Sequence, residues 1–184
     1  MDAHWDGDTL SIKTVEPDHL ARAVEVLRIN NAGCACRDAS ESRFAGIRLA
    51  DVQALFERPQ MPAERLASYL DRARFEPGPL PSLAETLLHA SVPAPCVAHA
   101  HPVSILALAA APNGDRVRVV YGERAVWLPP VSSPLERARL TAEAVRANSQ
   151  AHCLVLAGAG LVTWGDSPRD CDERIAPVPS CRTS

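Results

Sequence analysis

The sequence is poor in several features that mark whole classes of protein. Aromatic residues make up only 4% of its 184 residues, and its formal net charge at pH 7 is −3. Because nucleic acids and anionic membranes recruit basic surfaces, this charge predicts neither as a partner. No apolar run approaches the roughly 20 residues that a membrane-spanning helix needs. The first residues also lack the basic-then-apolar order of a signal peptide, so we expect a cytoplasmic protein.

The cysteines lack the spacing of zinc-binding or disulfide-rich domains. None of the six belongs to a CxxC pair, and we expect most of them to be reduced thiols. The length suits one domain with a substantial core and is too short for two domains of ordinary size.

The most informative stretch is residues 81–112. Within it, residues 97–101 form a short apolar run that predicts a β-strand, in which alternate side chains share a face. His99 and His101 would therefore project together. Two adjacent imidazoles can bind a divalent metal through neutral ring nitrogens. The spacing alone fits equally well one hydrogen-bonded core histidine and one surface histidine.

The segments on either side of this histidine pair strengthen the functional interpretation. Ser82 is a typical cap for a helix over residues 82–89, in which Glu85 and His89 lie one turn apart and share a face. Pro102 suits the first turn of a following helix over residues 103–110, which is almost wholly apolar and which we expect to be buried. This arrangement sets a carboxylate, as a general base, beside a metal.

The rest of the chain predicts alternating short helices and strands. A turn at residues 122–124 between two apolar runs predicts a β-hairpin. Residues 30–41 are small and polar and predict a loop. Further expected helices cover residues 16–29, 49–56, 62–73 and 134–147, with a short one capped by Asp166 or Ser167, and further expected strands cover residues 117–121, 125–128, 152–156 and 161–164.

From residue 44 to residue 175 the chain resembles the class II aldolase/adducin family, and most closely the aldolase half of bifunctional rhamnulose-1-phosphate aldolase/lactaldehyde dehydrogenase proteins. The segments PSLAETLLHA, VAHAHP, AVWLPP, AEAVRAN and LVTWGDSPRDCDERI follow in the family's order at about its spacing. The resemblance implies an α/β fold with three layers, α/β/α, around a central, mainly antiparallel sheet. We expect a divergent N-terminal segment of helix plus loop (1–43), the aldolase-like domain (44–175) and a disordered tail (176–184).

The activity that the resemblance implies is the zinc-dependent, reversible aldol cleavage of a ketose 1-phosphate, of the rhamnulose or fuculose type, to dihydroxyacetone phosphate and an aldehyde. His99 and His101 match two zinc-ligand histidines of the family, and Glu85 matches its acid/base carboxylate. The zinc would stabilise an enediolate while Glu85 moves the proton at the reacting carbon. The implied partners are a small sugar phosphate and further copies of the chain, usually in a tetramer with active sites between subunits.

The sequence departs from the family at the third zinc ligand. Where the family has a histidine, this chain has Ala159, between Gly158 and Gly160. Because a catalytic zinc site normally takes three protein ligands, two histidines should hold the metal much more weakly. Glu85 could complete the set, although a metal-bound carboxylate is less free to act as a base. His152 is a poorer substitute, since it lies at the opposite end of its strand from this turn.

Three further features of the family are missing. Its glycine- and asparagine-rich phosphate loop, which would supply backbone N–H groups to an anion, is not recognisable in residues 30–41. Its tyrosine after the AVWL segment is replaced by Pro130, and Tyr121 lies on a different expected strand. The sequence after Ile175 also stops short of where relatives continue.

Two classes of function follow. The chain is either an enzyme, a shortened aldolase or a related epimerase or decarboxylase that uses the same enediolate, or a non-catalytic oligomerisation or binding domain of the adducin-head type. A truncated gene product is a third interpretation. Glu85, His99 and His101 favour the enzyme, whereas Ala159, Pro130 and the missing loop favour the other interpretations.

Overall fold

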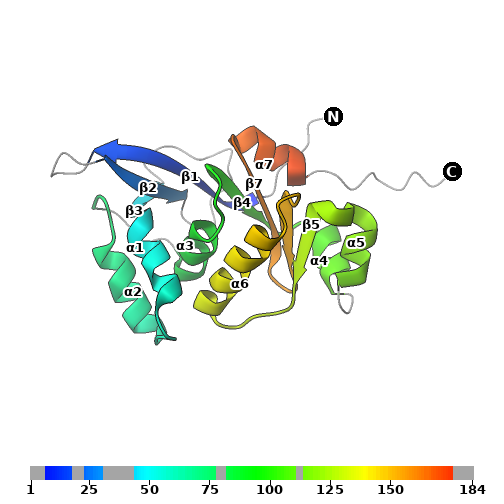
Figure 1. Cartoon of the computed structure of the whole chain (residues 1–184), viewed down its shortest axis with the longest axis horizontal. Helices are drawn as coiled ribbons and strands as arrows, with labels where there is room; N and C mark the ends of the chain where they lie inside the picture. The colour runs from blue at the N-terminus through cyan, green and yellow to red at the C-terminus, as the bar shows by residue number, and fades with distance from the viewer. Residues whose placement is uncertain (1–6, 18–22, 31–43, 78–81, 111–113, 176–184) are drawn as a thin grey trace.

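A sheet of seven strands carries helices on its two faces (Figure 1). The structure is a computed structural model, and it describes residues 7–17, 23–30, 44–77, 82–110 and 114–175. The expected tail, and all of the expected loop except its first residue, lie outside the described residues. The strands are β1 (Gly7–Pro17), β2 (Ala23–Asn30), β3 (Phe44–Arg48), β4 (Cys96–Ala100), β5 (Ala125–Leu128), β6 (Cys153–Leu156) and β7 (Gly160–Gly165).

The order of the strands brings three carboxyl ends to one edge of the sheet. Across the sheet the order is β3-β2-β1-β4-β7-β6-β5, and every neighbouring pair is antiparallel except β5 and β6. Because β4 and β6 both pair antiparallel with β7, the strands β4, β5 and β6 run in the same direction. Their carboxyl ends therefore meet at the edge where β4 leads into His101 and where β6 turns into β7.

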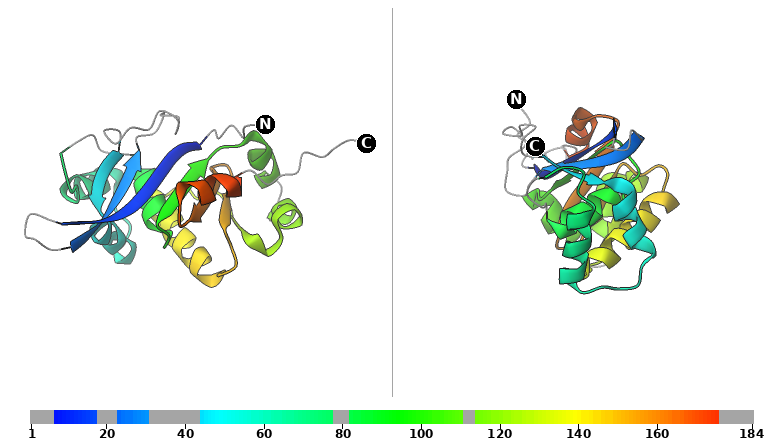
Figure 2. Two further views of the ribbon diagram at one scale, coloured as in Figure 1. Left: turned by 90° about the horizontal axis from the view of Figure 1, so that it is seen from above. Right: turned by 90° about the vertical axis from the view of Figure 1, so that its left-hand side faces the viewer.

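Helices cover both faces of the sheet, because alternate strand residues face opposite layers. On β4, Val97 packs with Leu88 and Val145, which come from two helices on one face, whereas Ala98 packs with Cys171 on the other face. Figure 2 shows helices on either side of the sheet. They are α1 (Leu49–Gln53), the 3-10 helix η3 (Ala54–Glu57), α2 (Ala63–Arg72), α3 (Leu83–Ala90), α4 (Val103–Ala109), α5 (Asp115–Tyr121), the 3-10 helix η5 (Gly122–Arg124), α6 (Pro134–Ala147) and α7 (Pro168–Ile175).

The layer assignment follows from cross-strand register. Thr163 of β7 lies opposite Ala98 of β4 and also opposite Cys153 of β6, so these residues share a face. Cys153 packs with Ile105 of α4 and Val117 of α5. Helices α4, α5 and α7 thus cover one face, and α3 and α6 cover the other. The expected α/β fold, with three layers around a mainly antiparallel sheet, is confirmed.

Most predicted elements inside residues 44–175 are confirmed, with ends that differ by about one residue. They include the helix at α3, the strand at β4 and the long helix α6, in which Ser133 accepts a hydrogen bond from the Glu136 N–H as its cap. Strands of the same sheet also lie before residue 44. The division of the chain at residue 43 stays a prediction.

The expected helix over residues 16–29 is wrong. Strand β1 extends to Pro17, and Ala23 begins β2, which pairs antiparallel with β1 from Ser11 opposite Ile29 onward. The apolar residues of this segment recur at a spacing that fits a helix. Val24, Val26 and Ile29 are β-branched, however, and β2 gains partners on both sides, so long-range pairing decides the outcome.

The expected strand over residues 117–121 and its hairpin are also wrong. The segment forms α5, in which Val117 and Tyr121, one helical turn apart, are both buried. Gly122, with a φ of 60°, ends this helix in a conformation that favours glycine. Strand β5 then pairs with β6 in parallel rather than with a preceding strand. A valine-rich sequence favours a strand locally, but here the helix places Val117 and Tyr121 in one core cluster with Ile105 of α4.

Helix α4 forms as predicted, but it is not buried on all sides. Ile105 and Ala109 lie in the core, whereas Val103 is 82% exposed. The expectation that the whole helix is buried was therefore wrong. Only one side of a helix that packs on the surface of a sheet faces the core. Among the described residues, no helix combines the length and the apolar character that crossing a membrane requires.

Candidate functional site

The three residues predicted for the site lie together at the carboxyl end of β4. Glu85, in the first turn of α3, places Oε2 2.8 Å from Nδ1 of His99. His99 is 2% exposed, whereas His101, just beyond the strand, is exposed. The two imidazole rings lie 4.6 Å apart between centroids and are tilted by 55°. The alternation of strand residues therefore brings both histidines to the same side, as predicted.

The second ring nitrogen of His99 is bound by the backbone. His99 Nε2 lies 2.7 Å from the carbonyl oxygen of Ala159, in the turn between β6 and β7. A carbonyl oxygen only accepts, so Nε2 carries a hydrogen and donates it. Gly160 permits this close approach, because a Cβ there would lie 2.5 Å from the Ala100 carbonyl oxygen and 3.1 Å from His99 Nε2.

A second, fully buried histidine extends this arrangement inward. His89 Nδ1 lies 2.7 Å from the Ser11 hydroxyl on β1, and its Nε2 lies 3.4 Å from Glu85 Oε2 without the alignment of a hydrogen bond. A polar chain thus runs from β1 through α3 to β4 and on to the Ala159 turn. We call Glu85, His89, His99 and His101 the acid–histidine cluster. The role of Ser11 was missed, because nothing local in the sequence links it to a residue 78 positions away.

The electrostatics of the cluster favour an ionised Glu85. Burial acts to raise the pKa of Glu85, but the imidazoles of His89 and His99 outweigh burial and hold the pKa below its usual range. For His89, burial is the largest effect and lowers the pKa, so this ring is neutral at pH 7. An ionised Glu85 accepts from Nδ1 of His99 while Ala159 accepts from Nε2. Both ring nitrogens of His99 therefore face acceptors.

The residues present do not fit the zinc ion that the family resemblance implies. A histidine ligand must offer a neutral ring nitrogen with a free lone pair, whereas Nε2 of His99 donates to a carbonyl oxygen and Nδ1 faces Glu85. Ala159 brings only a methyl group and its backbone. In the part of the chain that the structure describes, no three His, Cys, Asp or Glu side chains gather as a metal site.

The other residues that the sequence analysis considered lie outside the cluster. His152 is exposed, and its backbone N–H donates to the Arg124 carbonyl oxygen at the amino end of β6. Tyr121 is buried on α5, where burial raises its pKa to about 12. Pro130 lies close to Ala159 in space, because both line one hollow.

That hollow, which we call the edge hollow, has a volume of about 340 Å³. It lies at the carboxyl ends of β5 and β6 and is lined by residues 129–132, residues 156–159 and Arg137. Ala159 is part of this lining, and its carbonyl oxygen accepts the hydrogen bond from His99 of the cluster. The edge hollow therefore adjoins the acid–histidine cluster.

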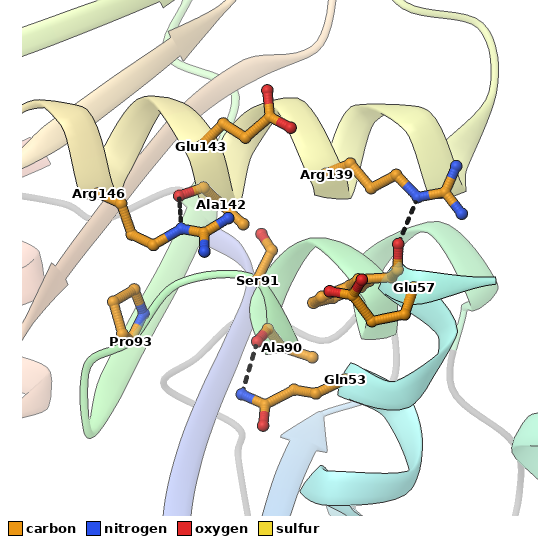
Figure 3. A pocket seen from close by; sticks show the side chains of 10 residues that line it. Gln53, Glu57, Ala90, Ser91, Pro93, Arg139, Ala142, Glu143 and Arg146 are labelled. Atoms are coloured by element: carbon orange, nitrogen blue, oxygen red, sulfur yellow. Dashed lines mark hydrogen bonds between the residues drawn. The ribbon is translucent and has the colours of Figure 1, made fainter.

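A larger hollow of about 390 Å³ lies at the other end of α3 (Figure 3). We call it the distal hollow. Its charged lining consists of two arginines and two glutamates, and Arg139 Nε donates to the Phe56 carbonyl oxygen at 2.8 Å. Gln53 reaches the Ala90 carbonyl oxygen at 3.4 Å. No residue of the acid–histidine cluster lines this hollow.

Known proteins match the chain over nearly all of its length. Residues 9–178 match the family model "Class II Aldolase and Adducin N-terminal domain". A curated relative from Bacillus subtilis (strain 168), "Uncharacterized oxidoreductase YuxG", is 35% identical over 177 residues, which are 95% of this chain and 26% of that protein. The chain thus spans about a quarter of the length of this relative.

Solved structures with this fold include two of particular interest. The N-terminal class II aldolase domain of a conserved protein from Thermoplasma acidophilum is 30% identical, with a TM-score of 0.82 over 92% of this chain and 78% of that one. L-Fuculose-1-phosphate aldolase from Thermus thermophilus is 18% identical, with a TM-score of 0.51 over 92% of this chain and 73% of that one, and shows the fold alone. With a family model that matches almost the whole chain, the protein belongs to the class II aldolase and adducin family.

Proposed function

We propose that this domain has kept the class II aldolase fold and its acid–histidine cluster but does not carry out metal-dependent aldol cleavage, and that it acts as a non-catalytic binding or oligomerisation domain of the adducin-head type. One observation carries this proposal. The Nε2 hydrogen of His99 is given to the carbonyl oxygen of Ala159, the residue at the family's third ligand position.

The burial of two histidines of the cluster supports the same proposal. His89 is fully buried and His99 is 2% exposed, while Glu85 is held between their rings. A carboxylate whose pKa is held low by two imidazoles is a weak base, because general bases work best with a pKa near the working pH. The cluster then serves chiefly to join β1, α3, β4 and the β6–β7 turn.

The metal content of the purified chain tests the proposal, measured beside a His99→Ala/His101→Ala double variant in the same buffer. We expect no stoichiometric zinc in either protein and no release of dihydroxyacetone phosphate from L-fuculose 1-phosphate or L-rhamnulose 1-phosphate with added zinc. Zinc near one equivalent that is lost in the double variant would contradict the proposal. Light scattering tests the oligomer, for which a mass of 19.8 kDa, that of one chain, argues against self-assembly.

A second candidate function is retained aldolase chemistry on a ketose 1-phosphate of the rhamnulose or fuculose type. It is favoured by the convergence of Glu85, His99 and His101 beside the edge hollow, at the joint carboxyl ends of three strands. In this function Glu85 would hold or release a proton, and the histidines would orient substrate oxygens. His99 would first have to leave the Ala159 carbonyl oxygen. Cleavage that is lost in Glu85→Gln, with the variant still folded, would favour this candidate over the first.

A further inference from the structure

We propose that the edge hollow binds a small organic anion, with Arg137 as the group that holds its carboxylate or phosphate oxygens. This inference goes beyond the proposed function, because such binding does not depend on whether aldol cleavage is retained. It rests on the charge of the lining, the fixed position of Arg137 and the contact between the hollow and the cluster.

The lining has a single sign of charge. Arg137 is the one ionisable side chain among the described residues that line the hollow, and its neighbours there are apolar apart from Ser132. A cation beside apolar walls attracts an anion more strongly than the same cation in open water. The distal hollow differs in this respect, since Glu57 and Glu143 offset its two arginines.

The Arg137 side chain is held in place by only some of its hydrogen-bond donors. Its Nε and Nη2 donate to the Val131 carbonyl oxygen at 3.3 and 2.8 Å, which fixes the guanidinium plane against the loop between β5 and α6. A guanidinium carries five N–H groups. The remaining three have no partner among the described residues and suit the paired oxygens of a carboxylate or a phosphate.

The size and place of the hollow define the ligand class. A volume of about 340 Å³ lies at the lower end of the range of small-molecule sites. Gly158 leaves open space, because a Cβ built there would meet no atom within 4 Å. The apolar walls, Pro129, Pro130 and Leu156, would contact a short carbon chain. A short-chain carboxylate and a small phosphate monoester share this chemistry.

Calorimetric titration of the full chain with two probes, butyrate and inorganic phosphate, tests the proposal at constant ionic strength with chloride as the counter-anion. We expect saturable binding of at least one probe, and the stronger of the two identifies the oxygen donor as carboxylate or phosphate. Arg137→Gln should weaken binding by about tenfold or more, because charge-assisted hydrogen bonds are lost. Arg146→Gln, on the same helix but in the distal hollow, should leave it unchanged.

A second pair of variants tests the same proposal if Arg137→Gln does not fold. Ser132 is exposed and lines the hollow, so Ser132→Glu would place a carboxylate near Arg137, whereas Ser132→Gln adds similar bulk without charge. We expect Ser132→Glu to abolish binding and Ser132→Gln to retain it. Absence of saturable binding of either probe, equal binding in Arg137→Gln and Arg146→Gln, or equal binding in the two Ser132 variants would overturn the proposal.

Discussion

The two ends of helix α3 differ in the charged groups beside them, a difference that the volumes of the two hollows do not reveal. The distal hollow, at the carboxyl end, is the larger, yet its charges form a balanced set of two arginines and two glutamates. At the amino end, Glu85 is enclosed by imidazoles that hold its pKa below the usual range, and the smaller edge hollow adjoins this cluster. The comparison teaches that a cluster of buried titratable groups with a shifted pKa identifies a candidate site better than empty space does.

Removal of His99 should produce the largest effect. His99→Ala leaves the partly buried Glu85 carboxylate without its 2.8 Å partner and leaves the Ala159 carbonyl oxygen unpaired. We expect the free energy of unfolding to fall by about 3 kcal/mol, the lower end of the range for breaking one partner out of a buried ion pair, because the Glu85 side chain is 16% exposed.

Denaturation with urea measures this loss. The control is His101→Ala, two residues along the chain and exposed, which should change the free energy of unfolding by less than about 0.5 kcal/mol. Equal losses in the two variants would mean that the buried His99 adds no more to stability than the exposed His101 does.

A histidine at the position where the family resemblance places the third ligand should convert the cluster into a metal site. Ala159→His adds an imidazole to the turn whose carbonyl oxygen binds His99, so zinc would displace that hydrogen bond, and three histidines with one open position suit zinc. At zinc concentrations about 100 times the dissociation constant, binding should stabilise the variant by about 2.7 kcal/mol. Thermal unfolding with and without zinc measures this shift.

Ala159→Leu is the matched control, since it adds bulk to the same turn without a ligand atom. Stabilisation of Ala159→His by zinc, absent in Ala159→Leu and in the wild-type chain, is the expected pattern. Equal zinc responses in Ala159→His and Ala159→Leu would argue that the third position does not decide metal binding in this domain.

A lysine near the carboxyl end of α3 should make stability depend on pH. Lys13 donates to the Val92 carbonyl oxygen, and burial lowers its pKa from 10.5 to about 8, although Glu25 acts in the opposite direction. The folded state therefore binds this proton less well than the unfolded state does. The destabilisation is fully present below pH 8 and is relieved as the pH rises from 8 towards 10.5.

Comparison with Lys13→Met isolates this contribution. Relative to the variant, the wild-type chain should gain about 1–2 kcal/mol in the free energy of unfolding between about pH 7 and pH 10. Chemical denaturation at a series of pH values measures the difference. Parallel pH profiles for the two proteins would show that Lys13 titrates alike in the folded and unfolded chain.

The sequence predicted the parts of the site that depend on local geometry. Strand alternation placed His99 and His101 together, and helical spacing placed Glu85 and His89 on one face. The Ala159 carbonyl oxygen was not predicted as the partner of His99, because any residue supplies the same backbone atom and only the fold brings it there.

The same limit explains the errors in the fold. Two segments fit one type of secondary structure locally and adopted another. The described part of residues 16–29 forms strands because β2 pairs with a strand on each side. Residues 117–121 form a helix because Val117 and Tyr121 pack in the core. Arg137 carried no signal at all, since a single arginine on a helix is ordinary. Its interest arises from the lack of a carboxylate among the described residues that line the edge hollow.

A substitution in the distal hollow should have the smallest effect on stability, and it tests whether the two ends of α3 really differ. Arg146 is exposed, and among the described residues its Nε donates at 3.1 Å to the Ala142 carbonyl oxygen of its own helix. Arg146→Ala should therefore change the free energy of unfolding by less than about 0.5 kcal/mol, as is usual for surface substitutions. A loss above about 1.5 kcal/mol, measured by urea denaturation, would mean that the arginines and glutamates of this hollow stabilise one another, and that balanced charge at this end of α3 matters as much as the buried charge at the other.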